Sequence, residues 1–564
     1  MTDISTVQLK TDILIIGGGA AGCMAAIEIK RLDPGIECVV MEKAHIERSG
    51  CLAMGLNAIN AYLNSGVTPE TYVKYVKDEF VGVIREDLVY SIAKGLEESV
   101  KQVEELGLPI EKDKHGNYRN RGKCSIKIYG ERLKPILADA VYKSKSKVLN
   151  RVVATNFIFD GERVRGAYGF GIRDDKLYVI HAKAVIVTTG GASRLYKPIN
   201  KGDARNTTWY CPWNVGTGYA MGIRIGAEMT SFENRFIPLR VKDVNAPTGT
   251  IGQGSNIRQI NSHGEEYLEK RYKHLGGRKC LALYRLLAIQ QENLANRGPC
   301  YLETRCLSKG QEKKLKEAYL SMNPAIVLLW SNNGHGPREN PVEINGMEPV
   351  VIGGHCQAGY WIDVERRTTI NGLFAAGDIA GGAPKKYVSG SWVEAKIAAR
   401  AAIEEIKEIG MPRVNNKETN KEKKRISNAR NGKKGIFPEE LEQAFHKVMD
   451  KYAGGASTNY ELTESKLVIA RKKLEELERK LELLNARDKH ELVSCLELID
   501  RFDVAKTLIE HLIYRKETRW PCYQSRVDYP ERDDAVWLKF INSVYDPEKK
   551  KFTIIERPLG FEKK

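Results

Sequence analysis

Long hydrophobic segments are absent from this sequence. No run of 18 apolar residues occurs anywhere in its 564 residues, whereas a membrane-spanning helix needs about 20. The first ten residues, MTDISTVQLK, also lack the basic and then apolar profile of a secretory signal. These two absences predict a cytoplasmic protein that has no transmembrane segment.

Cysteine motifs typical of metal centres are absent as well. The 11 cysteines include no C-x-x-C pair, and the closest two, Cys300 and Cys306, have neither iron–sulfur nor zinc spacing. An odd number of cysteines scattered over a long chain is typical of reduced thiols. We therefore expect no metal centre in this chain.

The composition is that of an ordinary globular protein. Hydrophobic residues make up 42% of the chain and charged residues 29%, which excludes global disorder and allows about three or four domains. The net charge of +17 raises the question of a polyanionic partner. Because the sequence contains no zinc finger, RNA-binding aromatic signature or recognition helix, no nucleic acid partner is predicted.

A glycine-rich turn between a strand and a helix is the first segment with clear chemistry. Residues 12–22 read DILIIGGGAAG, and glycines at this G-x-G-x-x-G spacing allow a tight turn and close approach of a pyrophosphate. The candidate ligand-binding residues are Gly17, Gly19, Ala20, Ala21 and Gly22. The next strand ends at Glu42, whose carboxylate can accept hydrogen bonds from a ribose. We predict dinucleotide binding; the alternative is a glycine-rich turn without a ligand.

Two later segments indicate which dinucleotide. Residues 184–191 (AVIVTTGG) and 369–378 (TINGLFAAGD) each read as a strand that ends in a glycine turn. Both resemble the second and third FAD-contacting motifs of flavoproteins with the two-dinucleotide-binding fold. This resemblance implies FAD rather than NAD, with contacts from Thr189, Gly190, Gly191, Gly377 and Asp378.

The spacing of these motifs implies a discontinuous FAD domain. The expected fold class is α/β with an α+β cap: a two-dinucleotide-binding-type FAD fold, an inserted capping domain and a C-terminal helical domain. The expected boundaries are 1–236 and 352–412 for the FAD domain, 237–351 for the cap, 413–437 for a basic linker and 438–564 for the helical domain. Residues 413–434 carry nine basic and two acidic residues, a net +7 of the total +17, which favours a solvated loop or linker.

Residues 42–60 narrow the choice among flavoproteins. They read EKAHIERSGCLAMGLNAIN. In succinate dehydrogenase and fumarate reductase flavoproteins, R-S is typically followed by the histidine that bonds covalently to FAD. Gly50 stands in that place here, so the resemblance implies a noncovalent FAD. The candidate FAD contacts in this segment are Glu42, Lys43, Arg48, Ser49, Gly50 and Asn60.

The same segment is similar to the alpha subunit of adenylylsulfate reductase, a member of the same superfamily. Further matches follow in order at 129–136, 208–210, 233–243, 283–285, 353–355, 386–391 and 517–523. Ordered matches across three expected domains make a chance resemblance improbable. The resemblance implies a flavoprotein subunit that interconverts adenylylsulfate with sulfite and AMP.

The chemistry that this resemblance implies uses the flavin as nucleophile. Reduced flavin N5 attacks the sulfur to give a flavin–sulfite adduct as AMP departs, and collapse of the adduct releases sulfite and oxidised flavin. The protein then has to orient the substrate and stabilise negative charge on the sulfuryl and phosphate oxygens.

Arg240 and His355 are the residues that the resemblance places at the sulfuryl end. Arginine offers a permanently charged fork for an oxyanion, and histidine can exchange a proton near neutral pH. Each residue also has a simpler interpretation. Arg240 could form a surface salt bridge, and His355 could satisfy the backbone of its loop.

Further site residues follow from the same resemblance. Asn60 is expected near flavin N5, Glu131 and Arg285 at the polar rim of the pocket, and Trp209 and Tyr387 against flavin or adenine. Alternatives are a helix cap for Asn60, an ion pair between Glu131 and Arg285, and core packing for the two aromatic residues. Two serines of the 386–391 segment, Ser389 and Ser391, complete the candidate FAD contacts.

Some positions depart from the family pattern. Lys385, Lys386 and Tyr387 stand where the family has H-K-F, and Ala395 and Lys396 where it has G-R. The loop 244–253 (VNAPTGTIGQ) lacks the aromatic and apolar residues of the family's adenine clamp. These departures put the adenine side of the site in doubt more than the sulfur chemistry.

Two other functions compete with this interpretation. A fumarate reductase or dicarboxylate-oxidising flavoprotein could use Arg240, Arg285 and His355 to bind carboxylates, although Gly50 and the segment ETRWP at 517–521 argue against it. An electron-transfer flavoprotein subunit would have no substrate of its own.

The expected electron donor is another subunit. Because no iron–sulfur motif occurs in this sequence, the resemblance implies a ferredoxin-type beta subunit with two [4Fe–4S] clusters. The heterodimer could pair further into a dimer of heterodimers.

Overall fold

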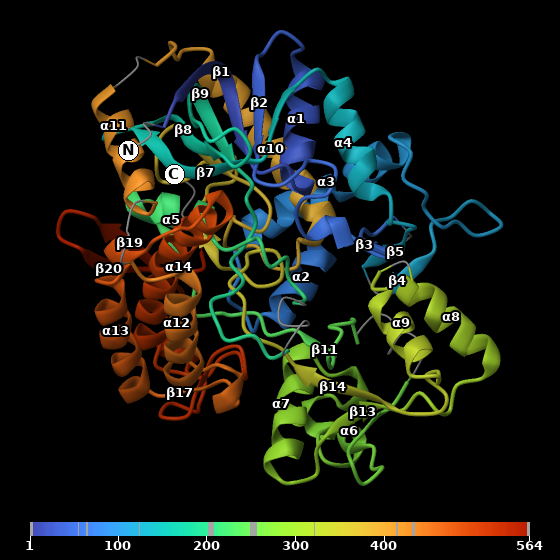
Figure 1. Cartoon of the computed structure of the whole chain (residues 1–564). Coiled ribbons are helices and arrows are strands. Elements are labelled where there is room, and N and C mark those ends of the chain that lie inside the picture. Colours follow the sequence, from blue (N-terminus) through green and yellow to red (C-terminus); the bar gives the residue numbers. More distant parts are fainter. Residues whose placement is uncertain are drawn as a thin grey trace.

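A seven-stranded sheet organises the N-terminal half of the chain (Figure 1). The computed structural model describes residues 4–54, 56–63, 66–122, 124–200, 208–248, 257–320, 322–412, 416–430 and 435–560. The strand order is β6-β2-β1-β9-β8-β7, and β16 pairs with β9. The bounds are β1 Thr6–Ile16, β2 Cys38–Glu42, β6 Lys147–Asn150, β7 Val152–Phe159, β8 Val164–Gly171, β9 Leu177–Val187 and β16 Leu373–Ala375.

Both faces of this sheet are buried. Along β1, Ile13 and Ile15 pack into one hydrophobic core, while Leu14 and Ile16 pack into the other. This alternation follows from the two-residue period of a strand, and burial on both sides explains the continuous apolar run in the sequence. The core of Ile13 and Ile15 is completed by α1 (Ala20–Leu32), α4 (Leu133–Lys143) and α10 (Tyr387–Ile406).

Strand β16 lies far along the chain but returns to the same sheet. It pairs in parallel with β9, with Leu373 opposite Val185. The sheet is therefore discontinuous in sequence, which is the arrangement that the separated glycine motifs predict. It also brings the carboxyl ends of β1, β9 and β16 to one edge.

The segment between 237 and 351 forms a smaller α+β unit with an antiparallel sheet and a core of its own. Its sheet has the order β11-β14-β13-β12. Tyr267, Ile289, Ile344 and Trp330 are among the residues of its separate hydrophobic cluster. The elements are β11 Leu239–Val241, β12 Gln259–Ile260, α6 Tyr267–Lys270, α7 Ala282–Leu294, β13 Cys300–Leu302, α8 Lys309–Leu320, α9 Ala325–Asn332 and β14 Val342–Gly346. We call this unit the cap.

The C-terminal region begins as the expected helices and then becomes a β hairpin. Helices α12 (Pro438–Tyr452), α13 (Glu464–Glu478) and α14 (Lys489–Tyr514) pack together. The hairpin of β19 (Phe540–Asp546) and β20 (Lys551–Arg557) joins a four-stranded sheet with β10 (Met229–Thr230) and β15 (Gly359–Tyr360). A purely helical C-terminal domain is therefore not what forms. The hairpin attaches the C-terminal region to strands that flank the cap.

The basic segment predicted as a loop or linker contains a helix, α11 (Asn416–Asn428). Glu422 on α11 accepts a hydrogen bond from Asn156 Nδ2 at 2.8 Å and pairs with Arg425 at 2.8 Å. Ile426 is fully buried. The interpretation as a solvated linker was wrong for 416–428, because a few buried contacts with the main sheet stabilise a helix whose composition is mostly lysine and asparagine.

Two elements beside the main sheet complete the frame of the site. Helix α3 (Glu86–Glu105) packs on α10. A three-stranded sheet in the order β3-β5-β4 is formed by β3 (Ala58–Asn60), β5 (Ser125–Lys127) and β4 (Asn120–Gly122), and it lies next to α8 and α9 of the cap in Figure 1. Among the helices of the described chain, none is both long and apolar enough to cross a membrane.

Candidate active site

A cavity of about 560 Å³ lies between the main sheet, the cap and the C-terminal region. One end is lined by the glycine turns of the main sheet, and the other by cap residues such as Arg240, Pro247 and Met322. Trp520 and Tyr523 add a wall from the C-terminal region. The volume lies within the roughly 300–1,000 Å³ usual for ligand and cofactor sites.

The glycines after β1 have the geometry that a pyrophosphate site needs. Gly17 has φ +100°, and a Cβ there would lie 2.7 Å from Thr188 O. A Cβ on Gly22 would lie 1.8 Å from Gly17 O, whereas one on Gly19 would meet nothing within 4 Å. Gly17 and Gly22 therefore close the strand–helix turn, and Gly19 leaves open space at the N-terminus of α1. An anion is stabilised at such a terminus.

The acidic residue after β2 is anchored in the same turn. Glu42 accepts hydrogen bonds from Gly18 N at 2.7 Å and Ala44 N at 2.6 Å, and it lines the cavity. Lys43 also lines the cavity and pairs with Glu497 at 2.8 Å. Glu42 is therefore held in place at the edge of the cavity, and its contact with a ribose stays a prediction.

The 48–50 segment contributes less directly. Ser49 Oγ donates to Gly18 O at 3.2 Å, so it supports the glycine turn from behind. Gly50 lines the cavity with φ +72°. Arg48 is exposed and lies outside the cavity lining, so the prediction of a direct contact from Arg48 has no support in the geometry.

A tyrosine connects the second and third glycine motifs. The Tyr210 hydroxyl donates to Asp378 Oδ2 at 2.9 Å and accepts from Gly191 N at 2.7 Å. Burial raises the pKa of Asp378 to about 6, although the bond from Tyr210 and the charge of Lys386 oppose the rise. Asp378 is thus buried at the cavity wall and ready to exchange a hydrogen bond with a polyol chain.

Several buried hydroxyls near these motifs have no partner within the described chain. They are Thr189 Oγ1, Thr217 Oγ1 and Ser389 Oγ. Thr189, Gly190, Gly377 and Ser391 line the cavity, while Gly191 and Ser389 lie just behind it. Unpartnered buried hydroxyls are rare in folded proteins, so their presence beside an open glycine cradle fits a polar cofactor such as FAD.

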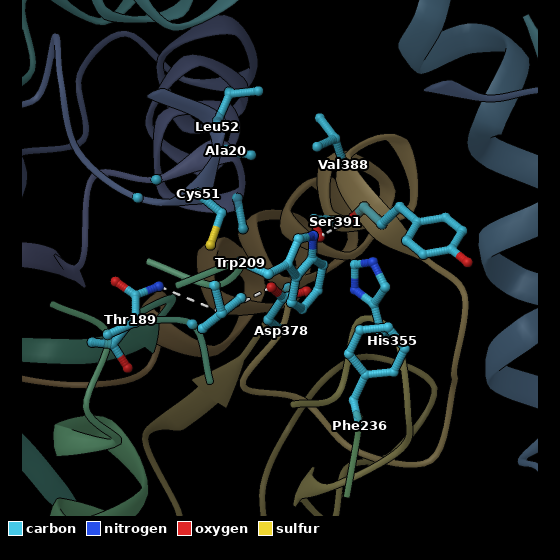
Figure 2. A pocket seen from close by; sticks show the side chains of 18 of the residues that line it. Ala20, Cys51, Leu52, Thr189, Trp209, Phe236, His355, Asp378, Val388 and Ser391 are labelled. Carbon is cyan, nitrogen blue, oxygen red and sulfur yellow. Dashed lines mark hydrogen bonds between the residues drawn. The ribbon is translucent and has the colours of Figure 1, made fainter. Parts of the chain in front are cut away.

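Four aromatic or cationic side chains surround His355 at the cap end of the cavity, the end that Arg240 lines. The His355 ring centroid lies 4.5 Å from that of Trp209, 4.8 Å from Phe236 and 4.5 Å from Tyr387. The Arg240 guanidinium lies 5.0 Å from the Trp209 centroid. Figure 2 shows Trp209, His355 and Phe236 close together beside Asp378.

The charges of this cluster are unusual. Burial lowers the pKa of His355 to about 3, and the neighbouring Arg240 adds to the shift. Burial likewise lowers the pKa of Arg240 to about 10. Arg240 donates to Leu239 O at 2.9 Å, and its Nε has no partner within the described chain. At the cap end, a neutral imidazole therefore lies beside the Arg240 cation. No carboxylate of the described chain pairs with this cation.

Asn60 faces the same space from β3. Its Nδ2 donates to Lys385 O at 2.7 Å and to Tyr72 OH at 3.1 Å. The residue lies in a strand, so the alternative of a helix cap does not apply. Because both bonds use the amide nitrogen, the amide oxygen is left to accept a bond in the cavity.

Two predicted rim residues lie outside the cavity lining. Glu131 is exposed just before α4, and Arg285 on α7 donates to Arg278 O at 2.8 Å. Neither lines the cavity, and the ion pairs of the described chain include none between them. Their place at the rim of the bound site stays a prediction.

Lys385 and Lys386, in the segment before α10 that departs from the family pattern, have different roles. Lys386 is buried and bonds Glu394 Oε2 at 2.9 Å, which also accepts from Gly377 N at 2.9 Å. Lys385 lines the cavity, pairs with Glu79 and donates to Tyr75 OH at 3.0 Å. Lys386 therefore fixes the third glycine motif, and Lys385 forms part of the cavity wall.

The altered loop after Arg240 also reaches the cavity. Asn245 and Pro247 line it, and residues 249–253 of the loop lie outside the described residues.

The sequence did not single out Asn57, Lys385 and Tyr210 as site residues. For Tyr210 the signal was its place in the 208–210 match. No signal marked Asn57.

A cluster of metal-binding side chains is absent from the described chain. No cluster of three or more histidine, cysteine, aspartate or glutamate side chains there could hold a metal ion. The 11 cysteines are all unpaired by disulfides.

Comparison with known proteins decides the family. A model described as the FAD binding domain matches residues 12–391, and one described as the fumarate reductase flavoprotein C-term matches residues 442–564. The adenylylsulfate reductase alpha subunit of Megalodesulfovibrio gigas is 30% identical over 641 residues, covering 98% of this chain and 96% of that protein. The chain belongs to the adenylylsulfate reductase alpha-subunit family. The prediction of this family and of FAD is confirmed.

Solved structures agree with this assignment. An adenylylsulfate reductase from Archaeoglobus fulgidus is 36% identical with a TM-score of 0.93, covering 99% of this chain and 97% of that one. An adenosine-5-phosphosulfate reductase in complex with sulfite as a covalent adduct is 36% identical with a TM-score of 0.92, covering 98% and 96%. A quinol fumarate reductase flavoprotein from E. coli is 19% identical with a TM-score of 0.84 over 99% of this chain and 98% of that one, and shares the fold.

Proposed function

We propose that this chain is the flavin-bearing catalytic subunit of an adenylylsulfate reductase, which interconverts adenylylsulfate with sulfite and AMP. The observation that carries the proposal is the buried pair of Arg240 and His355, enclosed by Trp209, Phe236 and Tyr387 at the end of the FAD cavity. The names of the adenylylsulfate reductase relatives support this substrate.

FAD, when bound, supplies two-electron redox chemistry and a nucleophilic N5. Gly50 occupies the position at which fumarate reductase flavoproteins have the histidine that bonds covalently to FAD. The cofactor of this chain is therefore held noncovalently. The chain's own contribution is a shaped and charged environment around the reacting sulfur.

Arg240 stabilises negative charge on the sulfuryl oxygens. Its guanidinium is held over the Trp209 ring at 5.0 Å, and in a dry site a fixed cation stabilises a developing oxyanion strongly. The guanidinium does not have to break an ion pair with the described chain to do so. This arrangement is therefore prepared before the substrate arrives.

His355 acts as a hydrogen-bond partner in its neutral form. With a pKa of about 3, the imidazole carries no charge at neutral pH. An anion bound between His355 and Arg240 would raise that pKa, because negative charge favours the protonated ring. His355 can therefore hold a proton near the substrate only while the substrate is present.

Asn60 positions one face of the cofactor. Lys385 O and Tyr72 OH fix its amide nitrogen, so the amide oxygen is directed away from them. This oxygen can accept a bond from the N5 proton of reduced FAD.

Electrons reach the flavin from a partner, which we propose to be a ferredoxin-type beta subunit with two [4Fe–4S] clusters. The partner would dock where the electron path to the flavin is short.

A steady-state assay of the purified complex tests this function. We expect sulfite oxidation with ferricyanide to depend on AMP, and Arg240→Gln and His355→Gln to reduce kcat/KM by about 100-fold or more. Lys242→Gln is the matched control, because Lys242 is a neighbouring exposed cation of the cap that pairs with Glu343 at 3.0 Å. It should retain the wild-type rate.

The same preparation is then assayed for fumarate reduction with a reduced dye. Fumarate turnover without AMP-dependent sulfite oxidation would replace the proposal with the fumarate reductase alternative. Flavin reduction by the partner without either turnover would support the electron-transfer alternative.

A further inference from the structure

A second arginine, Arg121, lies close to the cap end of the cavity. It belongs to β4, and the β4–β5 pairing shifts register between Asn120 and Gly122, so that Arg121 is the extra residue of a β-bulge. A bulge changes the direction of a side chain, and bulges are frequent next to active sites. Here the guanidinium donates a hydrogen bond to Oδ1 of Asn57, which lines the cavity.

Arg121 of the β3-β5-β4 sheet and Arg240 of the cap share one neighbour, Tyr319 on α8. The Tyr319 hydroxyl donates a hydrogen bond to Pro247 O at 3.0 Å. The backbone of Pro247 in turn forms an isolated antiparallel β-bridge with that of Arg240. Burial raises the pKa of Tyr319, and both guanidiniums oppose the rise. The Tyr319 hydroxyl is therefore within electrostatic reach of both cations.

Neither cation is neutralised by the protein. Within the described chain no carboxylate pairs with Arg121 or with Arg240, although other arginines in or near the cap, such as Arg271 and Arg297, pair with Glu292 at 2.8 and 2.9 Å. Burial lowers the pKa of Arg121 to about 10. Each cation that is removed from water without a counter-ion is unfavourable. A dianionic ligand would remove this penalty.

We propose that Arg121 is a second anion-binding residue of the cavity, whose guanidinium binds the phosphate of the nucleotide while Arg240 binds the sulfuryl oxygens. The inference rests on the proposed function. A sulfate–phosphate anhydride carries one negative charge on each half, so two separate arginines match its charge distribution. The planar fork of arginine suits both groups, and Asn57 holds the fork of Arg121 in place.

Binding of AMP and of adenosine to the FAD-loaded complex tests this assignment. Calorimetry should show that Arg121→Gln weakens AMP binding by about 10- to 100-fold, the effect of losing one charge-assisted hydrogen bond. Adenosine binding should change less than about twofold, because adenosine has no phosphate. Bleaching of the flavin absorption by sulfite alone should also be unchanged.

The matched control is Arg119→Gln. Arg119 is two residues away, its side chain is 58% exposed, and it pairs with Glu111 at 2.7 Å. This variant removes the same charge from the same segment and should bind AMP as the wild type does. Arg121→Lys keeps the charge but lacks the planar guanidinium fork, so it should give intermediate AMP affinity. If Arg121→Gln does not fold, AMP binding by Arg121→Lys is measured instead.

The proposal is overturned if AMP affinity of the Arg121 variants stays within twofold of wild type. It is also overturned if adenosine affinity falls as much as AMP affinity, or if Arg119→Gln has the same effect. Failure of the wild type to bind AMP, with binding of fumarate instead, would overturn the proposed function itself. The two failures are therefore distinguishable.

Discussion

Two pairs of arginine and histidine have opposite surroundings in this molecule. In the C-terminal region, Arg515 bonds Glu233 at 2.9 Å and Glu517 at 2.7 Å. His511 lies 3.1 Å from Glu233 Oε2 and 2.8 Å from Ser543 Oγ. Burial acts to raise the pKa of Glu233, but Arg515 and His511 hold it below its usual value.

The pair in the cavity has no such compensation. Arg240 has one bond to a backbone carbonyl, and no carboxylate of the described chain lies against it or against His355. Arg515 and His511 are fully buried, whereas Arg240 and His355 are partly exposed where they line the cavity. The difference indicates that compensated charges connect segments of the fold, whereas uncompensated charges in a cavity await a ligand.

The strongest test of this comparison is Arg515→Gln. Removing the cation leaves buried Glu233 with only His511 and buried Glu517 with only Arg519, so we expect the free energy of unfolding to fall by about 3–5 kcal/mol. Urea unfolding of the FAD-loaded chain measures it. A loss below about 1 kcal/mol would show that this network does not stabilise the fold.

The pH dependence of stability should come from the cavity histidine. The pKa of His355 is about 3 in the folded chain and about 6.5 when unfolded. The unfolded state therefore binds more protons below pH 6.5, and stability is lost as the pH falls from 6.5 toward 3. Between pH 6.5 and 5 this amounts to about 2 kcal/mol from His355.

His355→Gln should make that slope shallower by the same amount. His446, whose pKa burial lowers to about 4, contributes with the same sign and remains in both proteins. Urea unfolding at pH 6.5 and 5, without AMP or sulfite, gives the comparison. Equal slopes for wild type and variant would contradict the low pKa of His355.

Arg240→Gln should change stability much less than Arg515→Gln does. The substitution removes a buried cation that has no carboxylate partner, so we expect the free energy of unfolding to stay within about 1 kcal/mol of wild type, or to rise. The same urea titration measures it. A loss as large as that of Arg515→Gln would mean that Arg240 is structural and would remove the distinction between the two regions.

An exposed ion pair provides the smallest effect. Lys77 and Glu86 pair at 2.6 Å with side chains 45% and 52% exposed. Lys77→Gln should change the free energy of unfolding by no more than about 0.5 kcal/mol, because solvent screens the pair. A larger change would show that pairing matters independently of burial.

Local motifs made the cofactor end of the site predictable. Gly17, Gly22 and Glu42 lie within 26 residues of one another, and their roles follow from backbone geometry that a short segment already specifies. The sequence was less informative where distant contacts decide. Helix α11 depends on Glu422 meeting Asn156 of β7, and its lysine-rich composition alone favoured a loop.

The end of the cavity that holds Arg240 and His355 could be described only from the tertiary structure. The sequence supplied Arg240 and His355 through a family resemblance, but it also suggested Glu131 and Arg285, which do not line the cavity. Arg121 carried no motif, since its role depends on a bulge, on Asn57 and on a tyrosine of the cap.

The sequence by itself determined the family, the FAD cradle and the return of the chain to one sheet, because contiguous glycine turns and apolar strands specify these locally. Only the tertiary structure decided which cations are paired and which are not. Pairing and desolvation depend on side chains brought together from separate domains, and that arrangement is what makes Arg515 structural and Arg240 available to a ligand.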